Sequence, residues 1–454
     1  MPEGAGSSPD DAPRPADPSS LPRVLGLGDA TMLVVSSVIG VGIFFTPGGV
    51  ARSLPRADLF FAAWTLGGVL ALAGALANAE LGAMFPRAGG NYVYLRAAYH
   101  PSLGFLVGWL SFFAIFTGTV ATLAVGFADG LATFFPMPPA ARSVVAIGIV
   151  WLTSLVSISS TRAGARLNSA TGALKVLAMV GLVVAGLVLG SRAPAPAEAS
   201  APPDVGLGAF GLAMSPVIFS YLGWNASVYV AGEIKDPDKN LPRSLFIGLG
   251  VCTLVYVLVT WTYVRALGID GLAAVKGNVG EATARAIIGP GGRTVMAVMV
   301  LASVFGCLNA NVLVGPRIAY AMARDGLFWR GAARLRAGSQ TPHYAIIVQA
   351  AAASIVILRL KTFRSVLDYT TFAIVLATIA DTLALYVLRL RKPDQRRPYR
   401  AAGYPIVPGL YLLTNLGIAT SLAIGKPLEC VMGLLVLAAG VPVYLVFSRR
   451  RATG

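Results

Sequence analysis

Twelve long apolar stretches run through this chain of 454 residues, and they constrain its fold more than any other feature. A membrane-spanning α-helix needs about 20 mostly apolar residues to cross the hydrocarbon core of a bilayer. The stretches that meet this requirement cover residues 27–52, 58–82, 102–128, 141–160, 168–190, 209–232, 243–266, 292–324, 342–360, 366–389, 405–424 and 427–448. We therefore expect an all-α polytopic membrane protein with 12 transmembrane helices.

Charged residues are too rare for an ordinary soluble protein and are unevenly distributed. Only 12% of the residues are Asp, Glu, Lys or Arg, against about 25% in soluble domains. With the N-terminus inside, Lys and Arg favour the cytoplasmic segments by about two to one. We expect both termini to be cytoplasmic and the chain to cross the cell (cytoplasmic or inner) membrane many times. The net charge of +16 then reflects this asymmetry rather than a nucleic-acid partner.

The chain divides into one membrane domain and two tails. Residues 1–23 are rich in Pro, Asp and Ser and lack the apolar core of a signal peptide, so we expect a disordered cytoplasmic tail. Residues 24–448 form the membrane domain, in which a soft Pro/Ala linker at 191–204 follows the fifth span. Residues 449–454 form a second cytoplasmic tail.

Two of the spans are interrupted by helix-breaking residues. The first contains "IGVGIF" (39–44) followed by Pro47, and the sixth contains Pro216 and Gly223 within "SPVIFSYLGWNASVYVAGE" (215–233). Broken spans at matching positions are typical of transporters built from two inverted repeats. The offset of five spans predicts repeats at about 27–190 and 209–389, with extra helices at about 405–448. The alternative is that the glycines only allow close helix packing.

A broken span exposes backbone groups that lipid cannot satisfy, so the break must line a polar cavity inside the protein. Bare N–H groups near Gly42 suit a carboxylate. The free carbonyl groups that end the preceding half-helix suit an ammonium. An α-amino acid carries both charges, and glycine lets the backbone approach such a ligand closely.

The sequence resembles amino-acid permeases of the amino acid–polyamine–organocation superfamily, most closely the bacterial members of the L-type amino acid transporter branch. The resemblance covers about residues 24–448. The motifs that carry it are "VIGVGIFFTPGGVA" (38–51), "AELGAMFPRAGGNYVYLRAAY" (79–99), "FSYLGWNASVYVAGEIKDPDKNLPRSL" (219–245), "LNANVLVGPRIAYAMARDGLF" (308–328) and "RKPDQRRPYRAAGYP" (391–405).

The resemblance implies a LeuT-like core of ten helices in two inverted repeats, plus two more helices. It also implies uptake or exchange of amino acids by alternating access. By position, the substrate carboxylate and part of the amine would be held by Ser37, Val38, Gly40, Val41 and Gly42. The amine and an aromatic shield would involve Phe219, Ser220 and Leu222, with Asn225 on the pocket side. Phe372 would either form an apolar wall of the pocket or pack between helices.

Two residues depart from the family pattern. Val41 replaces the serine usually found between the two glycines, so carboxylate binding would depend on main-chain N–H groups. Leu222 stands where many members have a small residue, which would narrow the pocket and favour small side chains. The broken stretches contain no acidic residue, which favours neutral substrates.

Lys175 lies inside the fifth span, where a charge is costly and usually functional. The alternative is that its side chain reaches back to the interface. In the resembling branch a lysine here occupies the place of a sodium ion, and its ammonium would meet the carbonyl end of the first half-helix near Gly40, with Ser303 nearby. We therefore expect transport to be sodium-independent, by exchange or by proton coupling, since a buried lysine can also exchange a proton.

Other polar residues have less defined expectations. Glu80 would cap or pair near the cytoplasmic end of its span, and Asp381 would pair with an arginine or face the cavity. The charged segment from Glu233 to Lys239 indicates a solvated loop. Cys252, Cys307 and Cys430 lie in apolar segments, so we expect no disulfide-linked partner subunit, although eukaryotic relatives of this branch have one.

The sequence lacks the marks of the competing function classes. No HExxH motif, nucleophile elbow or P-loop occurs, and only two histidines are present, so we expect neither an enzyme nor a bound cofactor or metal. No selectivity filter or charged ring indicates a channel. The alternatives left open are a polyamine or organic-cation transporter and an amino-acid sensor or channel-like protein.

Overall fold

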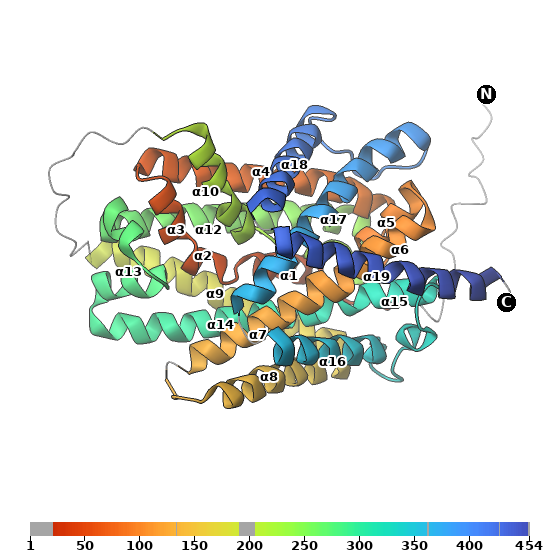
Figure 1. Ribbon diagram of the computed structural model, residues 1–454, viewed down its shortest axis with the longest axis horizontal. Helices are drawn as coiled ribbons and strands as arrows, with labels where there is room; N and C mark the ends of the chain where they lie inside the picture. The colour runs from red at the N-terminus through yellow and green to blue at the C-terminus, as the bar shows by residue number, and fades with distance from the viewer. Residues whose placement is uncertain (1–20, 133, 190–204, 361–362, 426, 453–454) are drawn as a thin grey trace, which may run out of the picture.

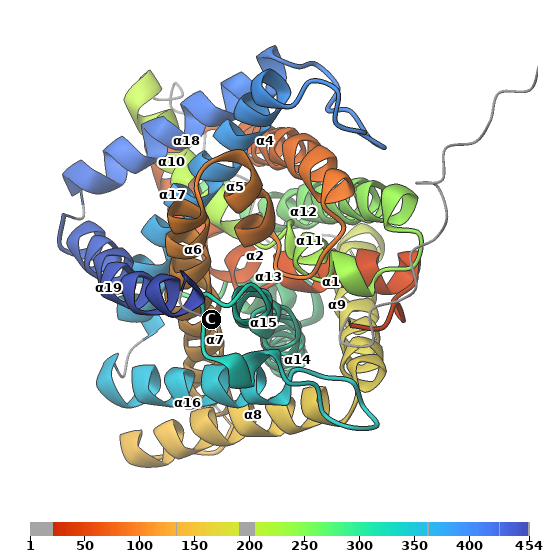
Figure 2. The ribbon, with the colours of Figure 1, turned by 90° about the vertical axis from the view of Figure 1, so that its right-hand side faces the viewer.

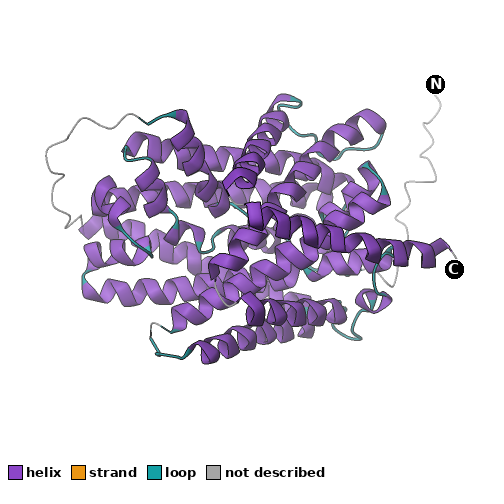
Figure 3. Cartoon of the chain, in the orientation of Figure 1, coloured by secondary structure: helices purple, strands orange, loops and turns teal. Residues whose placement is uncertain are grey.

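The computed structural model describes residues 21–452, except 133, 190–204, 361–362 and 426. The described residues are almost entirely helical, as Figure 3 shows. The predicted tail up to residue 20 and the predicted linker at 191–204 lie outside these residues. An isolated backbone bridge joins Leu25 to Ile234.

The helices follow one another along the chain with short connections (Figure 1). They are α1 (Leu27–Val38), α2 (Gly42–Phe45), α3 (Pro47–Ser53), α4 (Ala57–Met84), α5 (Asn91–Ala98), α6 (Pro101–Leu110), η2 (Ser111–Phe116), α7 (Thr117–Leu131), α8 (Pro139–Ser159), α9 (Thr161–Leu189), α10 (Leu207–Ser220), α11 (Ala226–Tyr229), η3 (Ala231–Glu233), α12 (Pro237–Ala274), α13 (Val279–Ile288), α14 (Pro290–Val314), α15 (Pro316–Arg324), η4 (Arg330–Ala333), α16 (His343–Leu360), α17 (Phe363–Arg391), α18 (Ile406–Gly425) and α19 (Pro427–Ala452).

Ten helices of the described chain are long and apolar enough to cross a membrane. Two more apolar helices, Gly208–Ser220 and His343–Arg359, are shorter. Each of the twelve predicted stretches contains helix, so the chain is a multi-pass membrane protein. The predicted stretch 243–266 is part of a longer helical segment, α12 (Pro237–Ala274), which is interrupted at Gly268, where φ is +69°.

The first span lies at the centre of the molecule and the last two lie at its edge. Within the most apolar part of Leu27–Phe45, 72% of the residues are buried, against 17% in each of the last two spans. Figure 2 shows α1 and α2 surrounded by other helices, with α18 and α19 on the outside. Leu413 and Leu435 on these outer helices are exposed, as lipid-facing residues are. The interrupted span is therefore shielded from lipid by the rest of the fold.

Both predicted interruptions are present. α1 ends at Val38, and helical structure resumes at Gly42. α10 ends at Ser220, and α11 begins at Ala226. The two breaks touch through their backbones: a Cβ on Gly42 would lie 2.7 Å from the Cα of Ser220. Gly223 has a φ of +96°, and a Cβ there would lie 2.8 Å from the carbonyl oxygen of Ser37. Packing between the breaks thus requires glycine at both positions, and the backbone conformation requires it at Gly223 as well.

A buried ion pair stabilises the segment after the second break. Arg317 of α15 donates from Nε and Nη2 to the Glu233 carboxylate, at 2.7 and 3.1 Å, and neither side chain is exposed. Nη2 also donates to the hydroxyl of Thr161 at the start of α9. The expectation of a solvated loop is therefore wrong for Glu233, because Arg317, which is distant in sequence, provides the buried countercharge.

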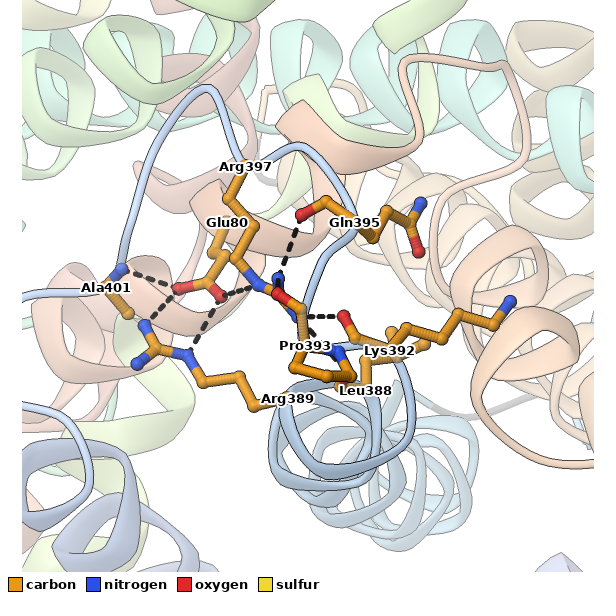
Figure 4. A network of polar contacts seen from close by, with 8 residues as sticks. All are labelled: Glu80, Leu388, Arg389, Lys392, Pro393, Gln395, Arg397 and Ala401. Carbon is orange, nitrogen blue, oxygen red and sulfur yellow. Dashed lines mark hydrogen bonds and ion pairs between the residues drawn. The ribbon is translucent and has the colours of Figure 1, made fainter.

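Glu80 connects α4 to the loop between α17 and α18 (Figure 4). Its carboxylate is buried and accepts hydrogen bonds from Arg389 at 2.6 and 3.0 Å, from Arg397 Nε at 3.2 Å and from the Ala401 N–H at 2.7 Å. Arg397 also donates to the backbone carbonyl groups of Lys392, Pro393 and Gln395 in the same loop and of Leu388 near the end of α17. One carboxylate therefore organises the whole connection.

We expect Glu80→Ala to lower the free energy of unfolding by about 3–5 kcal/mol, because it leaves buried arginine charge without a partner. The measurement is thermal or denaturant unfolding of the purified chain in detergent. The matched control is Asp238→Ala, which removes an exposed ion pair to Arg396 of the same loop and should cost no more than about 1 kcal/mol. Equal effects of the two substitutions would contradict a structural role for the Glu80 network.

Candidate functional site

A cavity of about 130 Å³ lies where the two breaks face α7, η2, α14 and α17. This is about ten times the volume that one water molecule needs, so the cavity can hold a small organic molecule. The breaks contribute Ser37, Val38, Gly40, Val41, Gly42, Phe219, Ser220, Leu222, Gly223, Asn225, Ala226 and Tyr229. The facing helices contribute Ile115, Phe116, Thr119, Thr122, Leu123, Cys307, Asn311, Thr370, Ile374, Ala377, Thr378 and Asp381.

Nine of the ten residues that the sequence singled out for substrate binding line this one cavity. They come from two stretches of the chain, beginning at Ser37 and at Phe219, that are about 180 residues apart in sequence. Phe372 is not among the lining residues. Its ring faces α19, where a Cβ on Gly433 would lie 2.8 Å from it. In the structure Phe372 therefore packs between helices and does not form a wall of the cavity.

The first break offers bare N–H groups to the cavity. Among the hydrogen bonds of the described residues, none is donated by the N–H groups of Val41, Gly42 or Ile43, whereas the Gly40 N–H is used by the Val38 carbonyl at 2.8 Å. Val41 and Gly42 line the cavity. A buried N–H without a partner is costly, so these groups favour a ligand with an anionic oxygen.

The carbonyl groups at the end of α1 are largely used by the protein itself. Lys175 Nζ donates to the carbonyl oxygens of Ser36 and Ile39, both at 2.9 Å. The Ser303 hydroxyl also donates to Ile39, at 3.1 Å. The Lys175 side chain is 3% exposed, so it does not reach the interface as the alternative proposed. Its ammonium meets the break next to Gly40, on the carbonyl groups of Ser36 and Ile39.

The carbonyl group of Ser37 has only a weak donor. Its partner is the Cys307 thiol, with a sulfur–oxygen distance of 3.5 Å, and thiols are weak donors. Gly40 has room beside it, since a Cβ there would meet only the Cys307 sulfur at 3.5 Å and the Val38 oxygen at 3.9 Å. The position that best suits an ammonium is therefore near Ser37, between the two breaks.

Tyr256 of α12 joins the two breaks, and the sequence reasoning missed it. Its hydroxyl lies 2.8 Å from the carbonyl oxygen of Val38 and 3.0 Å from that of Ser220. The ring is fully buried and packs against Trp64 and Tyr221. The one signal in the sequence was a polar hydroxyl group, that of a tyrosine, in the middle of an apolar span.

Asp381 of α17 lies in the cavity wall, which was one of the two sequence alternatives. Its Oδ2 accepts a hydrogen bond from the Tyr94 hydroxyl at 3.4 Å. That hydroxyl has a closer contact, 2.6 Å, with Oδ1 of Asn78. Asp381 forms no ion pair with an arginine among the described residues. The wall thus combines bare N–H groups at one break with a carboxyl group on the facing helix.

Comparison with known proteins identifies the type of molecule to which this site belongs. The chain matches the amino acid permease family over residues 25–441. It is 30% identical to the serine/threonine exchanger SteT of Bacillus subtilis (strain 168), covering 96% of this chain and 99% of that exchanger. It is also 30% identical to the large neutral amino acids transporter small subunit 2 and the Asc-type amino acid transporter 1 of Mus musculus, covering 94% of this chain and 81% of each.

We expect Tyr256→Phe to lower the free energy of unfolding by about 1–3 kcal/mol, because the hydroxyl proton that is shared between the carbonyl oxygens of the two breaks is lost. Tyr263→Phe on the same helix is the matched control: its ring is equally buried, and its hydroxyl has no partner among the described residues. Unfolding in detergent measures both variants. A Tyr263→Phe loss as large as that of Tyr256→Phe would show that the bridge between the breaks contributes nothing specific.

Proposed function

This chain belongs to the amino acid permease family, and from that premise we propose that it is a secondary active transporter of neutral L-amino acids. It takes up or exchanges them by alternating access, without sodium. The observation that carries this proposal is the cavity between the two breaks. Its lining includes Val41 and Gly42, whose N–H groups are bare, and Ser37, whose carbonyl group has only a weak donor. These groups suit the carboxylate and the ammonium of an α-amino acid.

In this proposal the N–H groups of Val41 and Gly42 bind the substrate carboxylate. The ammonium lies near the carbonyl groups of Ser37 and Phe219. Ser220 supports the site rather than binding substrate through its hydroxyl, since that hydroxyl donates to Pro216 O at 2.9 Å and contacts Thr46 Oγ1 at 3.0 Å. Leu222 and Asn225 bound the space for the side chain, so small neutral amino acids fit best.

The proposed architecture has twelve spans with an inverted-repeat core. α10 is short because it is only the first half of the sixth span, which ends at the break after Ser220. Helix His343–Arg359 has 17 residues by number and would span about 26 Å at 1.5 Å per residue, close to the hydrocarbon thickness of about 30 Å. Repeat one covers about 27–190 and repeat two about 209–389, with α18 and α19 outside the repeats. The breaks in α1–α2 and α10–α11 are then equivalent positions of the two repeats.

Both termini are proposed to be cytoplasmic. α5 and α15, which carry Arg96, Arg317 and Arg324, lie at the same end of the molecule as the C-terminus (Figure 1). α13 lies at the opposite end. Arginine-rich ends face the cytoplasm in membrane proteins. The three cysteines are buried, which supports a chain that works without a disulfide-linked partner subunit.

Sodium independence rests on Lys175. Its ammonium lies against carbonyl oxygens of the first break, where a bound cation would otherwise neutralise the negative end of α1. A fixed positive charge at this place makes an added sodium ion unnecessary and electrostatically unfavourable. The second candidate function is transport of an organic cation or polyamine, which the Asp381 carboxyl group in the cavity wall favours.

Uptake into proteoliposomes tests the proposal. We expect labelled serine, alanine or leucine to enter, to enter faster when unlabelled amino acid is inside, and to enter equally well when sodium is replaced by choline. Putrescine and lysine serve as competitors for the organic-cation alternative. A requirement for sodium, or competition by putrescine but not by neutral amino acids, would contradict the proposal.

We expect Lys175→Met to reduce uptake at least about tenfold, equivalent to about 1.4 kcal/mol of lost stabilisation, because the break loses its fixed charge. The control is Leu174→Ala, an adjacent side chain on α9 that is exposed on the outer surface and should retain wild-type uptake. Elution of each variant as a single species in detergent separates loss of function from misfolding. Wild-type uptake by a folded Lys175→Met variant would contradict the role assigned to this lysine.

A further inference from the structure

Asp381 is a carboxyl group on the cavity wall whose bonding is incomplete. It is 2% exposed, and its Oδ1 has no hydrogen-bond partner among the described residues. Oδ2 has only the long contact with Tyr94, at 3.4 Å. A buried carboxylate normally collects several donors or a cation. This one has a free oxygen beside a cavity large enough for a ligand.

The groups around Asp381 do not neutralise it. The titratable side chains close enough to interact with it are tyrosines: Tyr94 of α5, Tyr99 directly after α5, Tyr229 of α11 and Tyr411 of α18. α4 contributes the amide of Asn78 through Tyr94, and α7 contributes the hydroxyl groups of Thr119 and Thr122 to the same cavity.

Charged residues on the packed helices have other partners or lie elsewhere. Arg389, two turns along α17, is bound by Glu80 and lies 3.9 Å from the centre of the Tyr404 ring. Arg96 of α5 pairs with Asp325, and Asp129 of α7 pairs with Arg142. Within the described part of the chain, no ion pair reaches Asp381 from these helices or from His343 of α16.

Lys175, the other buried ionisable group near the breaks, has the opposite geometry. Both of its contacts are carbonyl oxygens, at 2.9 Å each, and carbonyl oxygens only accept hydrogen bonds. Lys175 is also not among the residues that line the cavity. Of the two groups, Asp381 is the one placed to change its charge during transport.

Resting on the proposed amino-acid transport, we propose that Asp381 is a proton-binding site of the transport pathway. It takes up one proton at Oδ1 from the cavity when an amino acid binds, and it releases that proton when the amino acid leaves. Ionised, Asp381 repels the substrate carboxylate in the same enclosed, weakly polarisable space. Protonated, it removes this repulsion and offers an O–H donor, so binding of a neutral amino acid and of a proton favour each other.

The sign of the pH dependence follows. Acid on the side of entry favours the protonated form and speeds uptake, whereas alkaline conditions on that side slow it. An acid-outside gradient of two pH units can support up to about 100-fold accumulation when one proton accompanies each amino acid. Exchange of external for internal amino acid needs no net proton movement and does not require the gradient.

The test uses proteoliposomes of the full chain, with internal pH held at 7.5, external pH between 5.5 and 7.5, labelled serine and a trapped pH-sensitive dye. For the wild type we expect uptake to rise as external pH falls, with acidification of the interior. Asp381→Asn should lose both responses, since a neutral amide neither takes up nor releases a proton. Asp381→Glu, which restores a titratable carboxyl group, should recover the gradient response.

The outcomes separate this proposal from the transport proposal. Absence of both uptake and exchange in the wild type would overturn amino-acid transport itself. Wild-type exchange without a gradient response, or a gradient response retained in Asp381→Asn, would overturn only the proton site.

A second measurement applies if Asp381→Asn is folded but inactive. We then expect serine to raise the thermal midpoint of the wild type more at pH 5.5 than at pH 8, and to raise that of the variant equally at both. The same pH dependence in both proteins would overturn the proposal. If the amide variant does not fold, Asp381→Glu must move the pH midpoint of uptake, and an unmoved midpoint overturns the proposal.

Discussion

The carbonyl groups freed where α1 stops are the constraint on which the rest of the structure depends. In the interior of a membrane protein no water is available to satisfy them, so other helices must. Lys175 from α9, Ser303 from α14 and Tyr256 from α12 each donate to carbonyl groups between Ser36 and Ile39. Three separate spans are thereby fixed around one interruption. The N–H groups that follow the same interruption, those of Val41 and Gly42, have no acceptor among the described residues. This difference between the carbonyl groups and the N–H groups makes the cavity suitable for a ligand.

Much of this arrangement could be predicted from local sequence. Gly40 and Gly42 marked the first break, and Gly223 marked the second, because proline and glycine disrupt helices in a recognisable way. A lysine inside an apolar span is so costly that Lys175 had to have partners. What the local pattern concealed was why Gly42 is glycine. Its neighbour is the backbone of Ser220, a packing reason that depends on two segments far apart in the chain.

The other parts of the site could not be predicted, because they depend on how each helix is oriented about its own axis in the packed structure. Tyr256 and Asp381 lie in ordinary apolar spans, and only tertiary packing turns one toward the breaks and the other toward the cavity. Phe372, on the same helix as Asp381, packs against Gly433 instead. Glu233 met its countercharge, Arg317, 84 residues later by number. Positive charges at helix ends indicate sidedness, but they do not indicate which carboxylate each will bind.

The direct contact between the two breaks has a mechanical consequence. Gly42 rests on Ser220, and Gly223 rests on Ser37, with no side chain between the backbones. Side chains can absorb a displacement by changing rotamer, but touching backbones transmit it. The two interrupted helices therefore behave as a single joint, in which a bend in one must displace the other. A ligand bound between them would therefore act on both interrupted helices at once.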